Sequence, residues 1–213
     1  MKTTIIVLAF LVLAASAQIF ATGAQSRSCG GVLVENGGNF IMQGGSVSGN
    51  TGGGVGISSG TFTMERGTIS GNSGGGVLIA SGNFSMENGT ISGNSGSGVN
   101  IGRSGAFTMA SGTISSNSGD QGGGIHISGG RFTMEGGSVV GNNTSGNGGG
   151  VYMDYGTFNK TGGTIGGNNE ASGNRNTAAR QGHAVYWDSS PVRWRNATYG
   201  PDDNPDSYGF WND

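Results

Sequence analysis

A unit of about 22 residues recurs along this chain of 213 residues. Its pattern is G-G-V-x-I-x-x-G-x-F-T-M-x-x-G-T-I-S-G-N, and residues 53–72 and 75–94 show it most clearly. A fixed period in this range is typical of a solenoid, in which each repeat forms one coil and packs on its neighbours. The repeat therefore constrains the shape of the molecule strongly and its chemistry weakly.

Three apolar anchors define the unit, and an Asn follows the third. The first is an aliphatic pair spaced by two: Val32/Val34, Val55/Ile57, Val77/Ile79, Val99/Ile101, Ile125/Ile127 and Val151/Met153. The second is Phe with Met two residues later: Phe40/Met42, Phe62/Met64, Phe84/Met86, Phe107/Met109 and Phe132/Met134. The third is one aliphatic residue: Val47, Ile69, Ile91, Ile114, Val139 and Ile165. Spacing by two buries alternate side chains, so each unit predicts three short strands.

Strands that wind in one direction and repeat should pair in parallel with their copies one coil away, about 4.8 Å apart. We therefore predict an all-β fold, a parallel β-helix over residues 25–202 with six regular coils and a degenerate seventh. The seventh contains Val185/Trp187, Val192/Trp194, Tyr199 and Asp202. Residues 203–213 would form a C-terminal tail or cap. Insertions follow the Asn and give long corner loops at residues 118–124, 143–150 and 169–182.

These repeats resemble the right-handed parallel β-helix group, the architecture of pectate-lyase-like proteins, over about residues 30–202. The run G-T-F-T-M-x-x-G-T-I-S-G-N is also similar to repeats of uncharacterised secreted or surface proteins from spirochaetes and other bacteria. The resemblance implies a right-handed β-solenoid of about seven coils with three short strands per coil. It implies almost nothing about activity.

The N-terminus has the pattern of a secretory signal peptide. Met1-Lys2 precedes an apolar run and then small residues, with cleavage expected after Ala17 or after Ala24. We assign residues 1–24 to this segment and expect a secreted or outer-surface protein with no membrane span in the mature chain. A single cysteine, Cys29, excludes an internal disulfide.

The Asn that ends each unit is the most regular polar feature. We expect a structural column in which stacked amides bond to one another, formed by Asn50, Asn72, Asn94, Asn117, Asn142 and Asn168. Asn also tolerates the left-handed backbone of a tight corner. Lys160 takes an inward position that is Met in other units.

The repeats lack the residues that pectate-lyase-like enzymes use, since those enzymes gather Asp residues and a basic Arg or Lys on one face. Asp120 and Asp154 belong to different units, and His126 and His183 are expected on the surface without a second ligand nearby. Glu65, Glu87 and Glu135 share an outward position, which we interpret as a solvated one. We therefore predict no catalytic, cofactor-binding or metal-binding residues, no cofactor, and a protein that is not an enzyme.

The C-terminal part combines Arg with aromatic residues, and two interpretations remain open. It could cap the exposed edge of the last coil, or it could stack on sugars. The candidate ligand-binding residues are Arg175, Arg180, Trp187, Arg193, Trp194 and Arg195.

The composition and the repeat together predict a non-catalytic structural or adhesive surface protein that presents its corner loops. Its partner would be an extracellular glycan or a host or cell-surface protein. Nucleic acid is not expected, because only 10% of residues are charged, the net charge is −2, and the repeats contain no basic patch. The alternatives are a polysaccharide-binding or polysaccharide-degrading β-helix, and an ice-binding solenoid that uses outward Ser/Thr rows such as Thr68/Ser70 and Thr90/Ser92.

Overall fold

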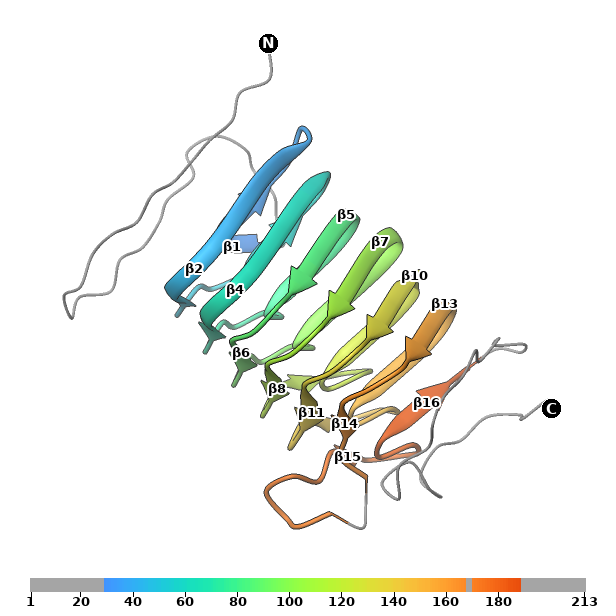
Figure 1. Ribbon diagram of the computed structural model, residues 1–213. Helices are drawn as coiled ribbons and strands as arrows, with labels where there is room; N and C mark the ends of the chain where they lie inside the picture. The colour runs from blue at the N-terminus through green and yellow to red at the C-terminus, as the bar shows by residue number, and fades with distance from the viewer. Residues whose placement is uncertain (1–28, 168–169, 189–213) are drawn as a thin grey trace.

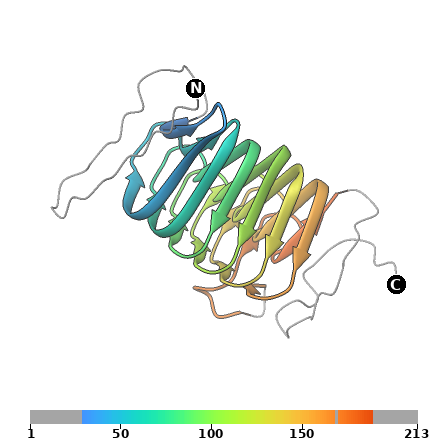
Figure 2. The ribbon, with the colours of Figure 1, turned by 45° about the horizontal axis from the view of Figure 1, so that its top comes forward.

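The computed structural model describes residues 29–167 and 170–188. All helix-or-strand structure in these residues is β-strand, and the strands stack along one axis (Figures 1 and 2). Every strand pairing is parallel, and each joins equivalent segments of successive coils. The predicted all-β parallel solenoid is therefore confirmed, with about six full coils and the start of a seventh. The expected signal peptide 1–24, the tail 203–213 and the rest of the seventh coil lie outside the described residues.

We number the coils so that each ends at its corner Asn. The coils are residues 29–50, 51–72, 73–94, 95–117, 118–142 and 143–176, and coil 7 begins at residue 177.

The first face of the solenoid carries the aliphatic pairs. Three strands lie wholly on this face: β1 (Cys29–Val34), β3 (Gly53–Ile57) and β16 (Val185–Trp187). The first parts of four longer strands also lie on it: β5 (Val77–Met86), β7 (Val99–Met109), β10 (Ile125–Met134) and β13 (Val151–Lys160). The last four long strands bend at a corner and continue onto the second face, where β2 (Gly38–Ser48) and β4 (Gly60–Ser70) join them.

The third face consists of the ends of β2 and β4 and of short strands. These are β6 (Thr90–Ser92), β8 (Thr113–Ser115), β11 (Ser138–Val140) and β14 (Thr164–Ile165). Their single aliphatic side chains point inward, as the buried position between two half-buried ones shows in β6, β8 and β11.

The core is a set of columns of identical side chains. Phe40, Phe62, Phe84, Phe107, Phe132 and Phe158 stack along the axis. Their ring centroids are 4.8–5.1 Å apart, with interplanar angles of at most 16°. Stacked aromatic contacts of this kind add stability beyond the burial of area. Lys160 continues the Met column opposite Met134 and is 9% exposed.

The Asn residues form a continuous buried ladder. Each side-chain oxygen accepts from both the backbone N–H and the Nδ2 of the Asn one coil before, for example Asn72 to Asn94 at 3.1 and 2.8 Å. Each Nδ2 also donates to a carbonyl in the preceding coil, as Asn94 does to Ile69. The ladder therefore gives the buried corner a partner for its polar groups, which an apolar side chain could not do.

The ladder corrects the prediction for Asn168. Below Asn142 the next position is occupied by Asn176, whose Oδ1 accepts from Asn142 N at 2.9 Å and Asn142 Nδ2 at 3.0 Å. Asn168 itself lies outside the described residues. The last insertion therefore lies before the corner Asn, between Ile165 and Asn176, and not after it.

The left-handed turn at this corner is made by the residue before the Asn, and not by the Asn as we had predicted. Gly49, Gly71, Gly93 and Gly141 have φ between +62° and +69°, and Ser116 has φ +56°. Gly adopts this conformation without steric cost, which explains the G-N pair that closes most units.

The insertions after the Asn form a second, small sheet. Its strands are β9 (Ser118–Gly119), β12 (Asn143–Thr144) and β15 (Thr177–Ala178), in the order β15-β12-β9. We call the stacked segments 118–124, 143–150 and 177–184 the ledge. The predicted corner loops 118–124 and 143–150, and the second part of the predicted loop 169–182, are thus hydrogen-bonded to one another.

Candidate functional site

The first face has one row of outward side chains, at the position between the two inward aliphatic residues. The row runs Leu33, Gly56, Leu78, Asn100, His126, Tyr152 and Tyr186. It changes from small or apolar residues in the first coils to polar and aromatic residues in the last ones. The outward row therefore varies along the axis, although the inward columns do not.

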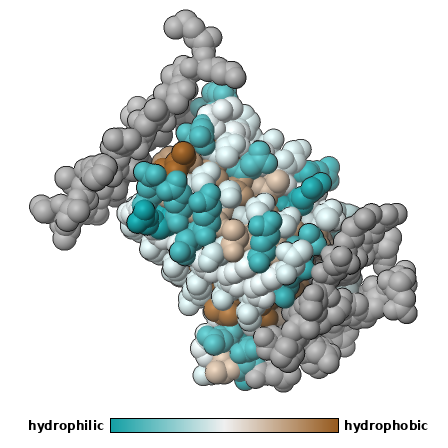
Figure 3. Space-filling model, viewed as in Figure 1, coloured by the Kyte–Doolittle hydropathy of each residue, from teal (hydrophilic) through white to brown (hydrophobic). Residues whose placement is uncertain are grey.

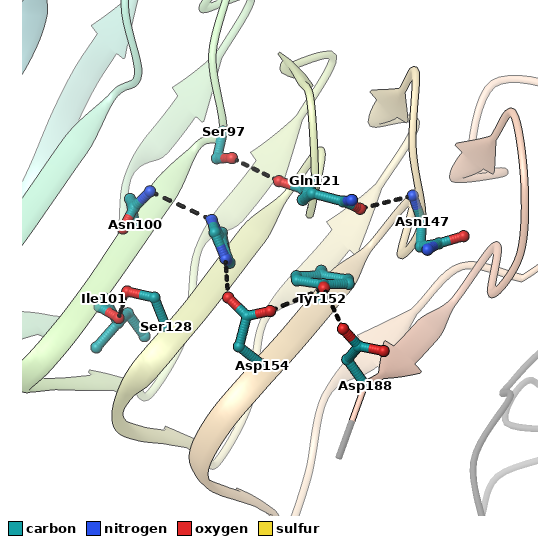
Figure 4. Close-up of polar contacts among 10 residues, drawn as sticks. Ser97, Asn100, Ile101, Gln121, Ser128, Asn147, Tyr152, Asp154 and Asp188 are labelled. Atoms are coloured by element: carbon teal, nitrogen blue, oxygen red, sulfur yellow. Dashed lines mark hydrogen bonds and ion pairs between the residues drawn. The ribbon is translucent and has the colours of Figure 1, made fainter.

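The polar members of this row form a hydrogen-bonded chain (Figure 4). His126 Nε2 lies 3.1 Å from Asp154 Oδ2, and Asn100 Nδ2 lies 3.4 Å from His126 Nδ1. Because the Asn100 amide nitrogen can only donate, both contacts are satisfied when His126 carries its proton on Nε2. Asp154 thus fixes the orientation of the imidazole, and Nδ1 accepts from Asn100.

Tyr152 links this pair to the last described coil. Its hydroxyl donates to Asp154 Oδ1 at 2.8 Å and lies 3.3 Å from Asp188 Oδ2. Its ring packs edge-on against His126 and parallel to Tyr186, with centroids 5.2 and 5.6 Å apart. Burial, and then the hydrogen bond to Asp154 and the charges of both carboxylates, raise the pKa of the Tyr152 phenol above its ordinary value. The phenol is therefore a neutral hydrogen-bond donor.

A second polar row runs along the ledge beside the first. Ser97 Oγ donates to the Gln121 carbonyl at 3.0 Å, and Gln121 Oε1 accepts from Asn147 N at 2.8 Å. Asn147 Oδ1 in turn accepts from Gln181 N at 3.1 Å. Figure 4 shows both rows crossing several coils.

A groove of about 440 Å³ separates the two rows over coils 2 to 5. Leu78, Asn100 and His126 line it on the face, and residues 95–97 and 119–121 line it on the corner side. The volume is in the range of small-molecule sites, and a few convergent polar groups are what such sites use for specificity. The groove is lined by the oriented His126 and by two residues with side-chain amides, Asn100 and Gln121.

Residues 11–175 match the family model described as the right handed beta helix region. The chain belongs to the right-handed β-helix family. No curated protein and no solved structure matches it significantly. The family establishes the fold of this β-helix, and it leaves the function to be argued from the groove and the surfaces.

The structure describes three of the six predicted C-terminal candidates, Arg175, Arg180 and Trp187. Trp187 is 6% exposed and occupies the inward position opposite Met153. Arg180 is exposed on the ledge, and Arg175 is half-buried beside the eight-residue insertion, with Nη2 3.4 Å from the Glu170 carbonyl. Arg193, Trp194 and Arg195 lie outside the described residues.

The sequence prediction missed the cluster around His126. We had expected His126 to lack a partner and Asp154 to be remote, whereas stacking of coils 5 and 6 brings them to 3.1 Å. The usable signal was the motif Tyr-x-Asp, which occurs at Tyr152/Asp154 and again at Tyr186/Asp188 in the next coil. Its two residues point outward because the residue between them is inward.

The other surfaces of this β-helix have fewer features that suggest a binding site. Glu65 accepts a hydrogen bond from Gln43 Nε2 at 3.1 Å, as a solvated side chain does. In residues 29–167 and 170–188 no three His, Cys, Asp or Glu side chains gather in an arrangement that could hold a metal ion. Figure 3 shows apolar areas that are small and separated, and the exposed large apolar side chains in the described part include Ile41 and Tyr155. No helix in the described part of the chain could cross a membrane.

Proposed function

We propose that this β-helix is an exported, non-catalytic surface protein of adhesive type, and that it binds an extracellular carbohydrate in the groove of its first face. Export is supported by the sequence pattern of residues 1–24. The observation that carries the binding proposal is the groove itself, with Asn100, Gln121 and an oriented His126 on its walls. These internal hydrogen bonds hold the two amides in place, so Asn100 Oδ1 offers an acceptor and Gln121 Nε2 a donor at fixed positions, as recognition of vicinal hydroxyls requires.

The proposal places the ligand on the first face and not on the C-terminal Arg and Trp residues. Asp120 is exposed and also lines the groove, and its carboxylate adds an acceptor for hydroxyl donors. Leu78 supplies an apolar floor on which the carbon face of a sugar could pack. The mixture of acceptor-rich walls and a small apolar floor favours neutral sugars over polyanions.

The test is a carbohydrate array followed by calorimetry with the double variant Asn100→Ala/His126→Ala. These residues are neighbours on coils 4 and 5. The matched control is Thr108→Ala/Thr133→Ala, which removes neighbouring outward side chains of the second face on the same two coils. We expect the groove variant to lose at least tenfold in affinity, about 1.4 kcal/mol or more, and the control to bind normally. Equal losses, or no binding by the wild-type protein, would contradict the proposal.

An enzyme that acts on polysaccharide is a second candidate, favoured by the His126–Asp154 pair and by the two carboxylates on Tyr152. An imidazole oriented by a carboxylate can act as a general base. Release of shortened or unsaturated sugars from the bound polymer, and its loss in His126→Gln, would establish this activity and overturn the non-catalytic proposal.

Ice binding is a third candidate, favoured by the register of the hydroxyl rows on the third face. Thr68, Thr90 and Thr113 pair directly across coils 2 to 4, and Ser70, Ser92 and Ser115 do the same. The row is interrupted at Val140, and Thr is also a good strand residue. Thermal hysteresis that disappears in Thr68→Lys/Thr90→Lys, with the fold intact, would bring this function forward.

A further inference from the structure

The groove covers only part of the length of the solenoid. Its lining residues come from coils 2, 3, 4 and 5, and none comes from coils 6 or 7. Since neighbouring coils are about 4.8 Å apart, the open part is on the order of 14 Å long. The lining of this groove therefore stops at coil 5, with His126 on the face and residues 119–121 of the ledge on the corner side.

One closing element is the change in corner length at coil 5. From the corner Asn to the next inward aliphatic residue there are five residues in coils 2 to 4, but eight from Asn117 to Ile125. The extra residues place Gly119, Asp120 and Gln121 on the wall of the groove. The wall is fixed on both sides, because Ser97 donates to the Gln121 carbonyl and Gln121 Oε1 accepts from Asn147.

The other closing element is Tyr152. It follows His126 in the outward row and is 4% exposed. The ledge lies against it: a Cβ on Gly148 would come within 2.7 Å of the Tyr152 Cβ. In coil 7 a Cβ on Gly182 would come within 2.6 Å of the Tyr186 Cβ. The ledge thus packs closely against Tyr152, which is buried, whereas the preceding members of the outward row, Leu78, Asn100 and His126, line the groove.

We propose that the groove binds the terminal unit of a linear oligosaccharide, with that unit against His126, Asn100 and Gln121 and the following units running toward coil 2. This inference rests on the proposed carbohydrate binding and adds that the recognised feature is a chain end. An internal stretch of polymer would have to pass through the space that Tyr152 and the ledge occupy.

The experiment is calorimetry with short and long members of the cello-, chito- and oligogalacturonate series, each tested free, capped at the reducing end and capped at the non-reducing end. We expect one protein molecule per chain at every length. We also expect a loss of at least tenfold in affinity when one of the two ends is capped, and little change when the other is capped.

A variant that moves the wall provides an independent check. Deletion of residues 119–121 leaves Asn-Ser-Gly-Gly-Gly-Ile, the same corner pattern as Asn72–Val77 in coil 3. Affinity should fall at every chain length, because the deletion also removes the Gln121 contact, but the groove should extend to the ledge of coil 6, and the chain length at which affinity stops increasing should grow by about one unit. Circular dichroism and the melting temperature show whether the variant is folded.

The outcomes separate the two proposals. End recognition is overturned if the number of protein molecules bound per chain rises with chain length and capping either end leaves the affinity unchanged. The carbohydrate-binding proposal would then still stand. The absence of binding to every series overturns the carbohydrate proposal and end recognition together.

Discussion

At the scale of single residues, the same side chain serves two different purposes depending on which way it points. Inward Asn residues are fully buried and bond only to one another and to carbonyls. Outward Asn100 bonds to His126 and lines the groove. The inward residues therefore determine stability, and the outward ones are available for recognition.

Replacing Asn94 by Ala should be strongly destabilising. The change removes the acceptor of the Asn72 N–H and of one Nδ2 hydrogen of Asn72, and the side-chain donor to the Ile69 carbonyl, in a buried corner. A buried group that loses its partner costs about 1–3 kcal/mol. We expect the free energy of unfolding to fall by about 3 kcal/mol in a denaturant titration. Asn83→Ala in the same coil removes an exposed amide and should change it by less than about 0.5 kcal/mol. Similar losses in both variants would contradict the ladder.

Tyr152 predicts a loss of stability at high pH. Its pKa is raised in the folded protein, so the unfolded chain releases this proton first, at about pH 10. The contribution is complete below that pH and declines above it, by up to about 1.4 kcal/mol per pH unit. Comparison of wild type with Tyr152→Phe isolates the effect, because Phe cannot ionise. If the free energies of unfolding of the two proteins decline in parallel above pH 10, Tyr152 does not titrate in this way.

At the scale of strands and corners, much could be predicted from the sequence. The spacing Val-x-Ile, Phe-x-Met and a lone Ile fixes which side chains face the core, and the structure buries all of them in coils 2 to 5. The ledge could not be predicted, because β9, β12 and β15 have two residues each and exist only because three insertions stack. The groove depends on the ledge, so it was missed as well.

The register of coil 6 was ambiguous for a local reason. Ile165-Gly166-Gly167-Asn168 has the spacing of a normal corner, so the pattern alone selects Asn168. The ledge favours Asn176, because the next inward residue, Val185, then follows nine positions later. The same step of nine positions joins Asn142 to Val151 one coil earlier. Matching ledge lengths would have been the better criterion.

Paired substitutions at these two positions test the register. Asn176→Ala should lower the free energy of unfolding by about 2–3 kcal/mol, because both amide donors of Asn142 lose their acceptor. Asn168→Ala should be close to neutral. The measurement is denaturant unfolding of both variants, and the reverse order of stability would restore the register that we predicted from the sequence.

At the scale of the whole molecule, stacking of like on like makes a long, regular scaffold, and the proposed binding groove lies where the regularity changes. The corner lengthens at coil 5, the outward row becomes polar at coil 4, and the two changes meet at the groove. A fully regular solenoid would present only flat faces. Binding should therefore be confined to one place along the axis, although the repeats extend over the whole of it.

The most direct measurement of this claim is an amide NMR titration of the protein with a short oligosaccharide that it binds. The account predicts shifts in the side-chain amide signals of Asn100 and Gln121 and in the imidazole of His126, with the third-face residues Thr68, Thr90 and Thr113 unchanged. Shifts that concentrate on the third face or around Arg175 and Arg180, with Asn100 and Gln121 unperturbed, would contradict it.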